Sequence, residues 1–379
     1  MTKVLVVTND FPPRPGGIQT FVHELVRRLD PADVTVFTSR WDRWEAFDRD
    51  QPFEVVRADT TMLLPTPQVR RQAVELLTAT GSDAVLFGAA APLGLMGPAL
   101  KAAGAERVVA LTHGHEAGWA QLPGARQLLR RIGEGVDVVT YLGEYTRSRI
   151  ASALTGPAAA RMVQLTPGVD AEVFSPRADG ESVRKSHGLD GRPVVVCVSR
   201  LMRRKGQDTL IEAFPALKRL VPDAALLVVG GGPYRGHLEQ LALDSTWAQD
   251  IHFTGSVPWG ELPDHYAAGD VFAMPSRTRR RGLDVEGLGI VYLEASSTGL
   301  PVVAGDSGGA PDAVLEGETG WVVPAGPAAP AELVRRLSVV LGDAALRESV
   351  GRRGREWVQQ EWSWDRQVQT LTGLLDPSA

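Results

Sequence analysis

Short apolar runs alternate with longer segments of helical periodicity along this chain, and the alternation occurs in two series. Such an order is typical of strand–helix–strand units, and it predicts an α/β fold with parallel sheets whose strands are buried on both faces. The first series predicts strands at residues 4–8, 34–38, 54–56, 84–87, 108–111, 136–140 and 162–165. The second predicts strands at residues 194–198, 225–229, 251–253, 271–273, 301–304 and 320–323.

A turn-rich stretch, residues 166–170 (TPGVD), separates the two series and suits a hinge between domains. The 379 residues are enough for two domains. We expect an N-terminal Rossmann-like domain over 1–168, joined by a C-terminal helix of about 362–379, and a C-terminal Rossmann-like domain over 169–361. Two doubly wound domains that face each other form a cleft at the carboxyl ends of their strands, where such folds bind ligands.

Composition excludes several classes of protein. Lys and Arg number 40 against 45 Asp and Glu, a formal net charge of −5, so no nucleic-acid partner is expected. The only cysteine, Cys197, lies in an apolar run, which excludes a disulfide framework and a thiolate metal site and fits a reducing cytosol. An apolar run from residue 4 leaves no room for a signal peptide, and Gly and Pro interrupt the longest uncharged stretch, so we expect a cytoplasmic protein without a membrane-spanning helix.

The loop after the first predicted strand ends in Gly16 and Gly17 and leads directly into a helix from Ile18. Two glycines at such a turn let the backbone approach a ligand closely, and the helix N-terminus offers free N–H groups to an anion. The pattern fits a bound phosphate or hexose, and a tight turn without a ligand explains it equally well.

A basic segment follows the first strand of the second series and includes Arg200 and Lys205. Its position at the carboxyl end of a strand directs it to the predicted cleft, where these two cations would hold a diphosphate. It is not a Walker A loop, because GxxxxGK[ST] is absent. A solvated run of charges is the alternative interpretation.

Two glutamates, Glu286 and Glu294, bracket a glycine-containing passage from a loop into a helix. A carboxylate is the natural acceptor for the two hydroxyls of a ribose. The backbone N–H groups between the glutamates would bind sugar hydroxyls or phosphate oxygens, namely those of Gly287, Leu288, Gly289 and Ile290. The alternative is a helix-capping loop with exposed carboxylates.

His113 and His115 follow the predicted strand 108–111, with Glu116 beside them. Their spacing fits no zinc motif, so a histidine that contacts a ligand is favoured over a metal site, and no metal is expected. The triplet 48–50 (DRD) resembles a metal-binding Asp-x-Asp, but it lies in a polar loop without a following strand context, and we expect it at the surface.

Taken in chain order, the Gly16-Gly17 loop, the His113 loop, Arg200 with Lys205, and the Glu286-x7-Glu294 pair resemble the retaining GT-B glycosyltransferases of family 4. The resemblance covers nearly the whole chain. It implies transfer of a hexose from a nucleotide sugar with retention of anomeric configuration, without an essential metal or another cofactor. It also implies that the N-terminal domain binds the acceptor and the C-terminal domain the nucleotide sugar.

The resemblance implies roles for the site residues as well. Arg200 and Lys205 would contact the diphosphate, and Glu294 would contact the ribose. Glu286 and the backbone amides after it would contact the transferred sugar. His113, or its neighbour His115, would contact the hexose near the reacting carbon, and Gly16 or Gly17 would approach the diphosphate. The predicted catalytic residues are therefore His113, Arg200, Lys205 and Glu286.

Four segments, 9–14 (NDFPPR), 87–93 (FGAAAPL), 112–116 (THGHE) and 282–289 (GLDVEGLG), are similar to an actinobacterial branch of this family. That branch transfers mannose from GDP-mannose to phosphatidylinositol monomannoside, which implies a phospholipid acceptor and a peripheral position on the inner face of the plasma membrane. Basic residues that interleave with apolar ones at helical spacing over 126–132, and a second basic site in the first domain, are then candidates for contacts with an anionic membrane, namely Arg70, Arg71, Arg126, Arg130 and Arg131. An ordinary amphipathic surface helix explains residues 126–132 equally well.

Other functions are compatible with the same two-domain architecture. One is a family 4 transferase that uses another nucleotide sugar or a soluble polyol or glycan acceptor. Two belong to different classes, a nucleotide-sugar epimerase and a non-catalytic two-lobed sugar-binding protein. The sequence also leaves open whether Arg279, Arg280 and Arg281 touch an acceptor phosphate or solvent, and it does not fix the oligomeric state.

Overall fold

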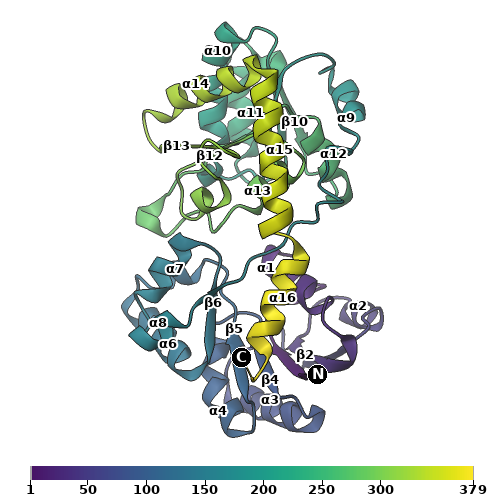
Figure 1. The fold of residues 1–379 in the computed structure, drawn as a ribbon, viewed down its shortest axis with the longest axis vertical. Coiled ribbons are helices and arrows are strands. Elements are labelled where there is room, and N and C mark those ends of the chain that lie inside the picture. The colour runs from purple at the N-terminus through teal and green to yellow at the C-terminus, as the bar shows by residue number, and fades with distance from the viewer. Residues whose placement is uncertain (1, 379) are drawn as a thin grey trace. The chain divides into compact units, whose positions relative to one another are not determined.

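The computed structural model describes residues 2–378, and for Arg281 it describes the backbone only. The chain forms two compact units, Met1–Pro167 with Trp364–Ala379, and Gly168–Ser363. Each unit is a parallel β-sheet covered by helices (Figure 1). The fold class predicted from the alternation of apolar and helical segments is therefore confirmed in both units.

The first unit has a seven-stranded sheet in the order β3-β2-β1-β4-β5-β6-β7. Because β1 lies between β2 and β4, the order reverses beside β1, which creates the switch point where doubly wound sheets bind ligands. All seven predicted strands are found. They are β1 Val4–Val7, β2 Val34–Ser39, β3 Glu54–Ala58, β4 Ala84–Phe87, β5 Arg107–Ala110, β6 Val138–Tyr141 and β7 Val163–Gln164.

Helices cover both faces of this sheet, and the last one comes from the far end of the chain. They are α1 Gly17–Val26, α2 Trp44–Arg49, α3 Pro67–Thr80, α4 Gly97–Ala102, α5 Glu116–Trp119, α6 Pro123–Gly135, α7 Glu144–Ala151, α8 Gly156–Ala160 and α16 Trp364–Leu375. Helix α16 buries Leu371 in the same apolar cluster as residues of β1 and α1. The Gln367 side chain accepts a hydrogen bond from the Thr166 amide at 3.1 Å, which fixes α16 to the end of the first unit.

The second unit has a six-stranded sheet in the order β10-β9-β8-β11-β12-β13, and its switch point lies between β8 and β11. All six predicted strands are found. They are β8 Val194–Val198, β9 Ala225–Val229, β10 Ile251–Gly255, β11 Val271–Met274, β12 Val302–Gly305 and β13 Gly320–Val323. The helices are α9 Gly180–His187, α10 Gln207–Leu220, α11 Arg235–Leu243, α12 Leu262–Ala267, α13 Ile290–Ser297, α14 Ala329–Gly342 and α15 Ala344–Glu361.

A buried arginine fixes the loop after β1. The Arg57 side chain is 1% exposed and donates hydrogen bonds to both oxygens of Asp48, at 2.7 and 2.9 Å. It also donates to the backbone carbonyls of Pro12 and Ser39, at 2.7 and 2.8 Å. Asp48 therefore lies in a structural ion pair, and the expectation that the whole 48–50 triplet is surface was wrong for this residue, because a buried charge needs a partner.

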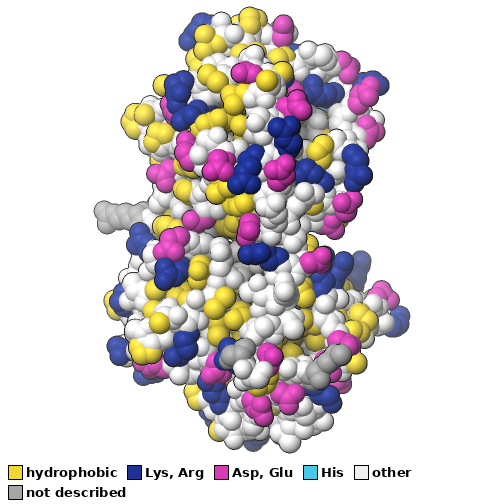
Figure 2. Space-filling view, viewed as in Figure 1, with side chains coloured by type: hydrophobic (Ala, Val, Ile, Leu, Met, Phe, Trp, Pro, Cys, Tyr) yellow, Lys and Arg dark blue, Asp and Glu magenta, His cyan; other side chains and the backbone are white. Residues whose placement is uncertain are grey.

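Within residues 2–378, no helix combines the length and the apolar character needed to cross a bilayer. Cys197 is buried in β8, and desolvation raises the pKa of its thiol to about 12, so the thiol is neutral. On the face that Figure 2 shows, acidic and basic side chains are interspersed, without a broad field of one sign.

Candidate active site

Three loops meet at the carboxyl edge of the second sheet. Gly206 ends the loop after β8 with a φ of +76°, and a Cβ there would lie 2.0 Å from the Pro275 carbonyl oxygen after β11. A Cβ on Gly305, at the end of β12, would lie 2.1 Å from the Ser276 carbonyl oxygen. Only glycine allows these close approaches, which bring the loops together beside the switch point.

Lys205 and Glu286, both predicted as catalytic, form a buried ion pair at this edge. Lys205 Nζ lies 2.6 Å from Glu286 Oε2, and the residues are 8% and 7% exposed. Arg204 Nη1 lies 3.2 Å from the same oxygen, so two cations compensate one carboxylate. Arg204 lies in the same basic segment as Lys205, and no local pattern predicts its contact with Glu286, because the two residues are distant in the chain.

The backbone of Glu286 is held as firmly as its side chain. Its amide donates to Ser307 Oγ at 3.3 Å, and its carbonyl accepts from the Gly309 amide at 2.9 Å. A Cβ on Gly309 would lie 2.2 Å from the Gly287 carbonyl oxygen, so the loop after β12 packs directly on the glutamate loop. The Glu286 carboxylate is thus a fixed feature of the site, not an exposed helix cap.

Arg200 is an exposed cation whose guanidinium makes no ion pair or hydrogen bond with any residue the structure describes. Its carbonyl accepts a hydrogen bond at 3.2 Å from Nε2 of buried Gln207, which also donates to Ser199 Oγ at 2.8 Å. The loop is therefore ordered while the charge is free. This arrangement suits an anionic ligand, because the cation need not break an internal pair to bind it.

The glycine passage leads into α13 as predicted. Gly289 precedes the helix with a φ of +81°, and no side chain caps the helix start, which leaves N–H groups there for a ligand. Leu288 is 4% exposed, so its side chain belongs to the core and only its backbone can contact a ligand.

Glu294 lies on α13, where its Oε2 accepts a hydrogen bond from the Tyr266 hydroxyl of α12 at 2.6 Å. Desolvation raises the pKa of Glu294 to about 7, while the hydrogen bond from Tyr266 and the charge of Lys205 act in the opposite direction. The carboxyl group therefore changes between its neutral and charged forms near pH 7. Tyr266 was not predicted, because nothing local distinguishes it from a core aromatic residue.

A second, partly buried ion pair connects the same loops and was also not predicted. Arg277, after β11, donates to both oxygens of Asp208 on α10 at 2.8 and 2.5 Å, and the Tyr234 hydroxyl donates to Asp208 at 2.8 Å. Desolvation alone would raise the pKa of Asp208, but these hydrogen bonds and the Arg277 charge lower it. The Arg277 amide donates to the Arg204 carbonyl at 2.8 Å, so the pair supports the Lys205 loop.

In the first unit, Gly16 precedes α1 and Gly17 begins it, one residue before the predicted start at Ile18. A Cβ on Gly16, at a φ of +155°, would lie 2.1 Å from the Gln19 side-chain oxygen. A Cβ on Gly17 would meet nothing within 4 Å, and the residue is exposed. Internal packing therefore does not explain the second glycine, whereas the close approach of a ligand would.

His113 follows β5, and its Nε2 lies 2.6 Å from the Gly88 carbonyl oxygen. That nitrogen must carry the proton to donate, so Nδ1 is the acceptor of the neutral ring. Burial lowers the pKa of His113, although the nearby Glu116 carboxylate acts in the opposite direction. Buried Glu116 also accepts from the His113 amide at 2.9 Å and holds the loop. His115 is more exposed and lies 3.3 Å from Glu116.

The predicted membrane contacts differ in their surroundings. Arg126 donates to backbone carbonyls of Ala120 and Ser152, and Arg130 pairs with Glu134 of the same helix at 3.2 Å. The apolar residues of α6 face the core, since Leu129 and Ile132 are 2% and 1% exposed. The remaining three are exposed and make no ion pair with any described residue, namely Arg70, Arg71 and Arg131.

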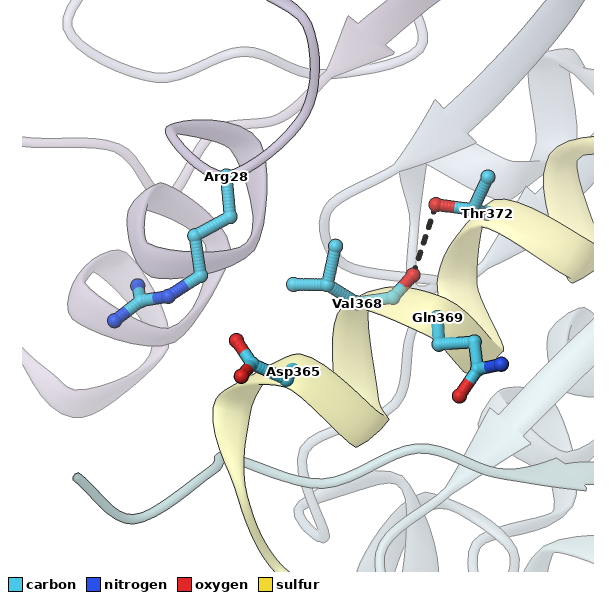
Figure 3. Close-up of a pocket in the computed structure, with 5 residues that line it drawn as sticks. All are labelled: Arg28, Asp365, Val368, Gln369 and Thr372. Atoms are coloured by element: carbon cyan, nitrogen blue, oxygen red, sulfur yellow. Dashed lines mark hydrogen bonds between the residues drawn. The ribbon is translucent and has the colours of Figure 1, made fainter. Parts of the chain in front are cut away.

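An open groove of about 530 Å³ lies beside α1 and α16 in the first unit (Figure 3). Its lining is Arg28, Asp365, Val368, Gln369 and Thr372, and the Thr372 hydroxyl donates to the Val368 carbonyl at 2.9 Å within α16. None of the predicted site residues lines it. Among the residues described, no three His, Cys, Asp or Glu side chains are placed to hold a metal ion.

Two Rossmann-like units, each a parallel sheet with ligand-binding loops at the carboxyl edge beside its switch point, are the architecture of the GT-B glycosyltransferases. The chain matches the family described as glycosyl transferases group 1 over residues 179–357 and glycosyltransferase family 4 over residues 15–173. It belongs to glycosyltransferase family 4.

Its relatives include two actinobacterial enzymes. The GDP-mannose-dependent alpha-(1-6)-phosphatidylinositol monomannoside mannosyltransferase of Mycolicibacterium smegmatis is 50% identical over 98% of both chains. A monoacylated alpha-(1-6)-phosphatidylinositol monomannoside mannosyltransferase of Corynebacterium glutamicum, also GDP-mannose-dependent, is 45% identical over 98% of this chain and 97% of its own length. Among solved structures, HepE of Anabaena in complex with UDP has a TM-score of 0.81 at 19% identity and covers 99% of both chains.

Proposed function

We propose that this glycosyltransferase transfers mannose from GDP-mannose to a phosphatidylinositol monomannoside acceptor, with retention of anomeric configuration. The observation that carries the proposal is the placement of unpaired Arg200 and buried Lys205 on one loop at the switch point of the second sheet. The near-full-length relatives with this named activity support the choice of donor and acceptor.

The reaction breaks the bond between mannose C1 and the β-phosphate oxygen, and the electron pair of that bond leaves with GDP. Negative charge grows on the diphosphate while the sugar becomes cationic, so fixed cations stabilise the transition state more than the ground state. Arg200 and Lys205 supply those cations, and the N–H groups of Gly289 and Ile290 add partial positive charge. An acceptor hydroxyl then bonds to C1 from the same face, and its proton passes to the leaving phosphate oxygen.

The remaining roles follow the chemistry of each group. Glu294 accepts hydrogen bonds from the ribose hydroxyls, and Glu286 from hydroxyls of the mannose. Contacts of Gly16, Gly17 and His113 with the donor stay predictions. Two cations take the place that a metal ion has in other transferases, so the reaction is expected to proceed without one.

Action at a membrane surface is supported by the loop between β3 and α3. Met62 and Leu64 in this loop are 55% and 43% exposed, which is unusual for large apolar side chains, and Arg70 and Arg71 follow on α3. Exposed apolar residues in a loop, followed by free cations on the next helix, are suited to an anionic bilayer surface such as the inner leaflet of a plasma membrane. Because the apolar face of α6 packs on the core, Arg131 would add charge only.

The deciding experiment incubates the protein with labelled GDP-mannose, with and without the purified lipid acceptor and with EDTA. Acceptor-dependent release of GDP and a product heavier by one mannose support the proposal. Conversion of the donor without acceptor would identify an epimerase, and binding without turnover a sugar-binding protein. A panel of UDP- and GDP-sugars and soluble polyols tests whether the enzyme uses another donor or a soluble acceptor.

Sedimentation with vesicles tests the membrane surface. Replacement of Arg70 and Arg71 by Gln should weaken binding to vesicles that contain phosphatidylinositol, by about 1 kcal/mol per charge removed. Arg219, which is also exposed and lies on α10 of the other unit, provides the matched control. Equal binding of all variants, or equal binding to neutral vesicles, would contradict the membrane assignment.

A further inference from the structure

The chain makes a short excursion between β11 and the glutamate loop. It leaves at Arg279, turns through the 3-10 helix Arg280–Gly282 and returns at Asp284. The Arg279 amide donates to the Asp284 carbonyl at 2.8 Å, and the Asp284 amide donates back to the Arg279 carbonyl at 3.2 Å. The excursion 279–284 is therefore a closed, hydrogen-bonded turn whose tip carries Arg280.

Ion pairs attach the excursion to the predicted sugar site. Asp284 Oδ1 lies 3.3 Å from Arg204 Nε, and Asp284 Oδ2 lies 3.7 Å from Arg279 Nη1. Arg204 also contacts Glu286 at 3.2 Å, so a single guanidinium bridges the excursion and the glutamate held by Lys205. The tip is thus held at a fixed place relative to Glu286, the predicted contact of the transferred sugar.

Arg280 itself has no compensating group among the residues the structure describes. It is exposed, makes no ion pair or side-chain hydrogen bond, and adopts a φ of +50°. A non-glycine residue in this left-handed region is strained, and such strain gathers at binding sites. Leu283, on the same turn, is 54% exposed. A free cation and an exposed apolar side chain therefore share one anchored turn.

We propose that Arg280 binds the phosphodiester of the lipid acceptor, while Leu283 contacts the apolar part of the same molecule. The inference rests on the proposed function and adds an acceptor contact in the second unit. A guanidinium matches a phosphodiester through paired hydrogen bonds, and a phospholipid offers an apolar group next to that anion. The excursion would then position the acceptor hydroxyl relative to the sugar held by Glu286.

The test compares Arg280→Gln, Arg280→Lys and Arg280→Gly with Arg219→Gln as the control, in micelles of neutral detergent. Arg280→Gln should raise the acceptor KM about tenfold and leave the donor KM and kcat within twofold, because one charge-assisted contact is lost. Arg280→Lys should recover part of the affinity. Arg280→Gly should be at least as stable to urea as the wild type, since the strain is gone, and yet show the raised acceptor KM.

The deacylated acceptor distinguishes binding of the acceptor's own phosphodiester from binding to the phosphodiesters of a lipid surface. It keeps the anion and lacks the acyl chains, so Arg280→Gln should raise its KM by a similar factor, and Leu283→Ser should matter only for the acylated form. An effect confined to binding of acceptor-free anionic vesicles would overturn the inference. If the wild type transfers mannose and Arg280→Gln has an unchanged acceptor KM, the Arg280 inference fails and the proposed function stands. If the wild type transfers no mannose, both the inference and the proposed function fail.

Discussion

The ion pair between Lys205 and Glu286 makes the role of the diphosphate loop testable. Replacement of Lys205 by Met keeps most of the side-chain volume and removes the charge. The pair is 2.6 Å long and both residues are almost fully buried. At an effective dielectric constant of about 20, two unit charges ~4 Å apart attract each other by about 4 kcal/mol. A cation in such a buried site stabilises the charge of a leaving diphosphate far more strongly than it would in water.

Two effects of Lys205→Met can be separated by magnitude. Loss of one preorganised cation should lower kcat by about 10²–10³, which corresponds to about 3–4 kcal/mol of transition-state stabilisation. The fold should lose less, about 1–3 kcal/mol in free energy of unfolding, because Arg204 still compensates Glu286 at 3.2 Å.

Steady-state GDP release and urea unfolding measure the two effects on the same preparations. The double variant Lys205→Met with Glu286→Gln removes both charges and should recover most of the lost unfolding free energy without recovering turnover. A Lys205→Met enzyme with kcat within threefold of the wild type would refute the leaving-group role. Recovery of turnover in the double variant would show that Lys205 acts only by neutralising Glu286.

Three further perturbations follow from the geometry. Glu294 has a raised pKa of about 7, so it is protonated below that pH and charged above it; the donor KM should therefore rise about tenfold from pH 8 to pH 6, measured by steady-state kinetics. Gly206→Ala would place a Cβ 2.0 Å from the Pro275 carbonyl oxygen at a φ of +76°, and should lower the unfolding free energy by more than about 3 kcal/mol in urea titrations. Arg57→Gln removes the buried charge that pairs with partly buried Asp48 and should cost about 3–5 kcal/mol of unfolding free energy by the same method.

Each of these has its own control. Glu294→Gln should show a donor KM that is flat over the same pH range, and a wild-type profile without a slope would remove the ribose role. Gly17→Ala meets no atom within 4 Å and should keep its stability, so equal losses at both glycines would refute the steric argument. Arg49 is exposed beside Asp48, and Arg49→Gln should stay within about 0.5 kcal/mol of the wild type.

The strands were predictable because parallel strands buried on both faces appear as nearly unbroken apolar runs. β8, for example, has five residues that are all at most 4% exposed. The place of the site was also predictable, because strand ends fix which loops meet. Its internal pairing was not: Arg204 meets Glu286 across 82 positions of the chain, and Arg277 meets Asp208 across 69. A pattern read along the chain does not show which distant charges fold together.

Helix α6 illustrates the opposite difficulty. Basic and apolar residues at helical spacing predict an amphipathic surface helix and do not say what covers the apolar side. The structure places Leu129 and Ile132 in the core and engages Arg126 with backbone carbonyls. Solvent exposure, which the sequence does not reveal, makes Met62 and Leu64 the apolar candidates for membrane contact instead.

The contrast between Arg200 and Lys205 gives the proposed mechanism a physical order. Arg200 is unpaired, so it can attract the donor diphosphate from solution without cost to the fold. Lys205 is already compensated by Glu286 and adds less to ground-state binding. In the proposed mechanism, hydroxyls of the bound sugar donate hydrogen bonds to the fixed Glu286 carboxylate, which weakens its hold on the Lys205 charge and leaves more of that charge to act on the departing phosphate oxygen. A cation whose partner changes along the reaction favours the transition state over the bound substrate, which is the distinction that raises kcat.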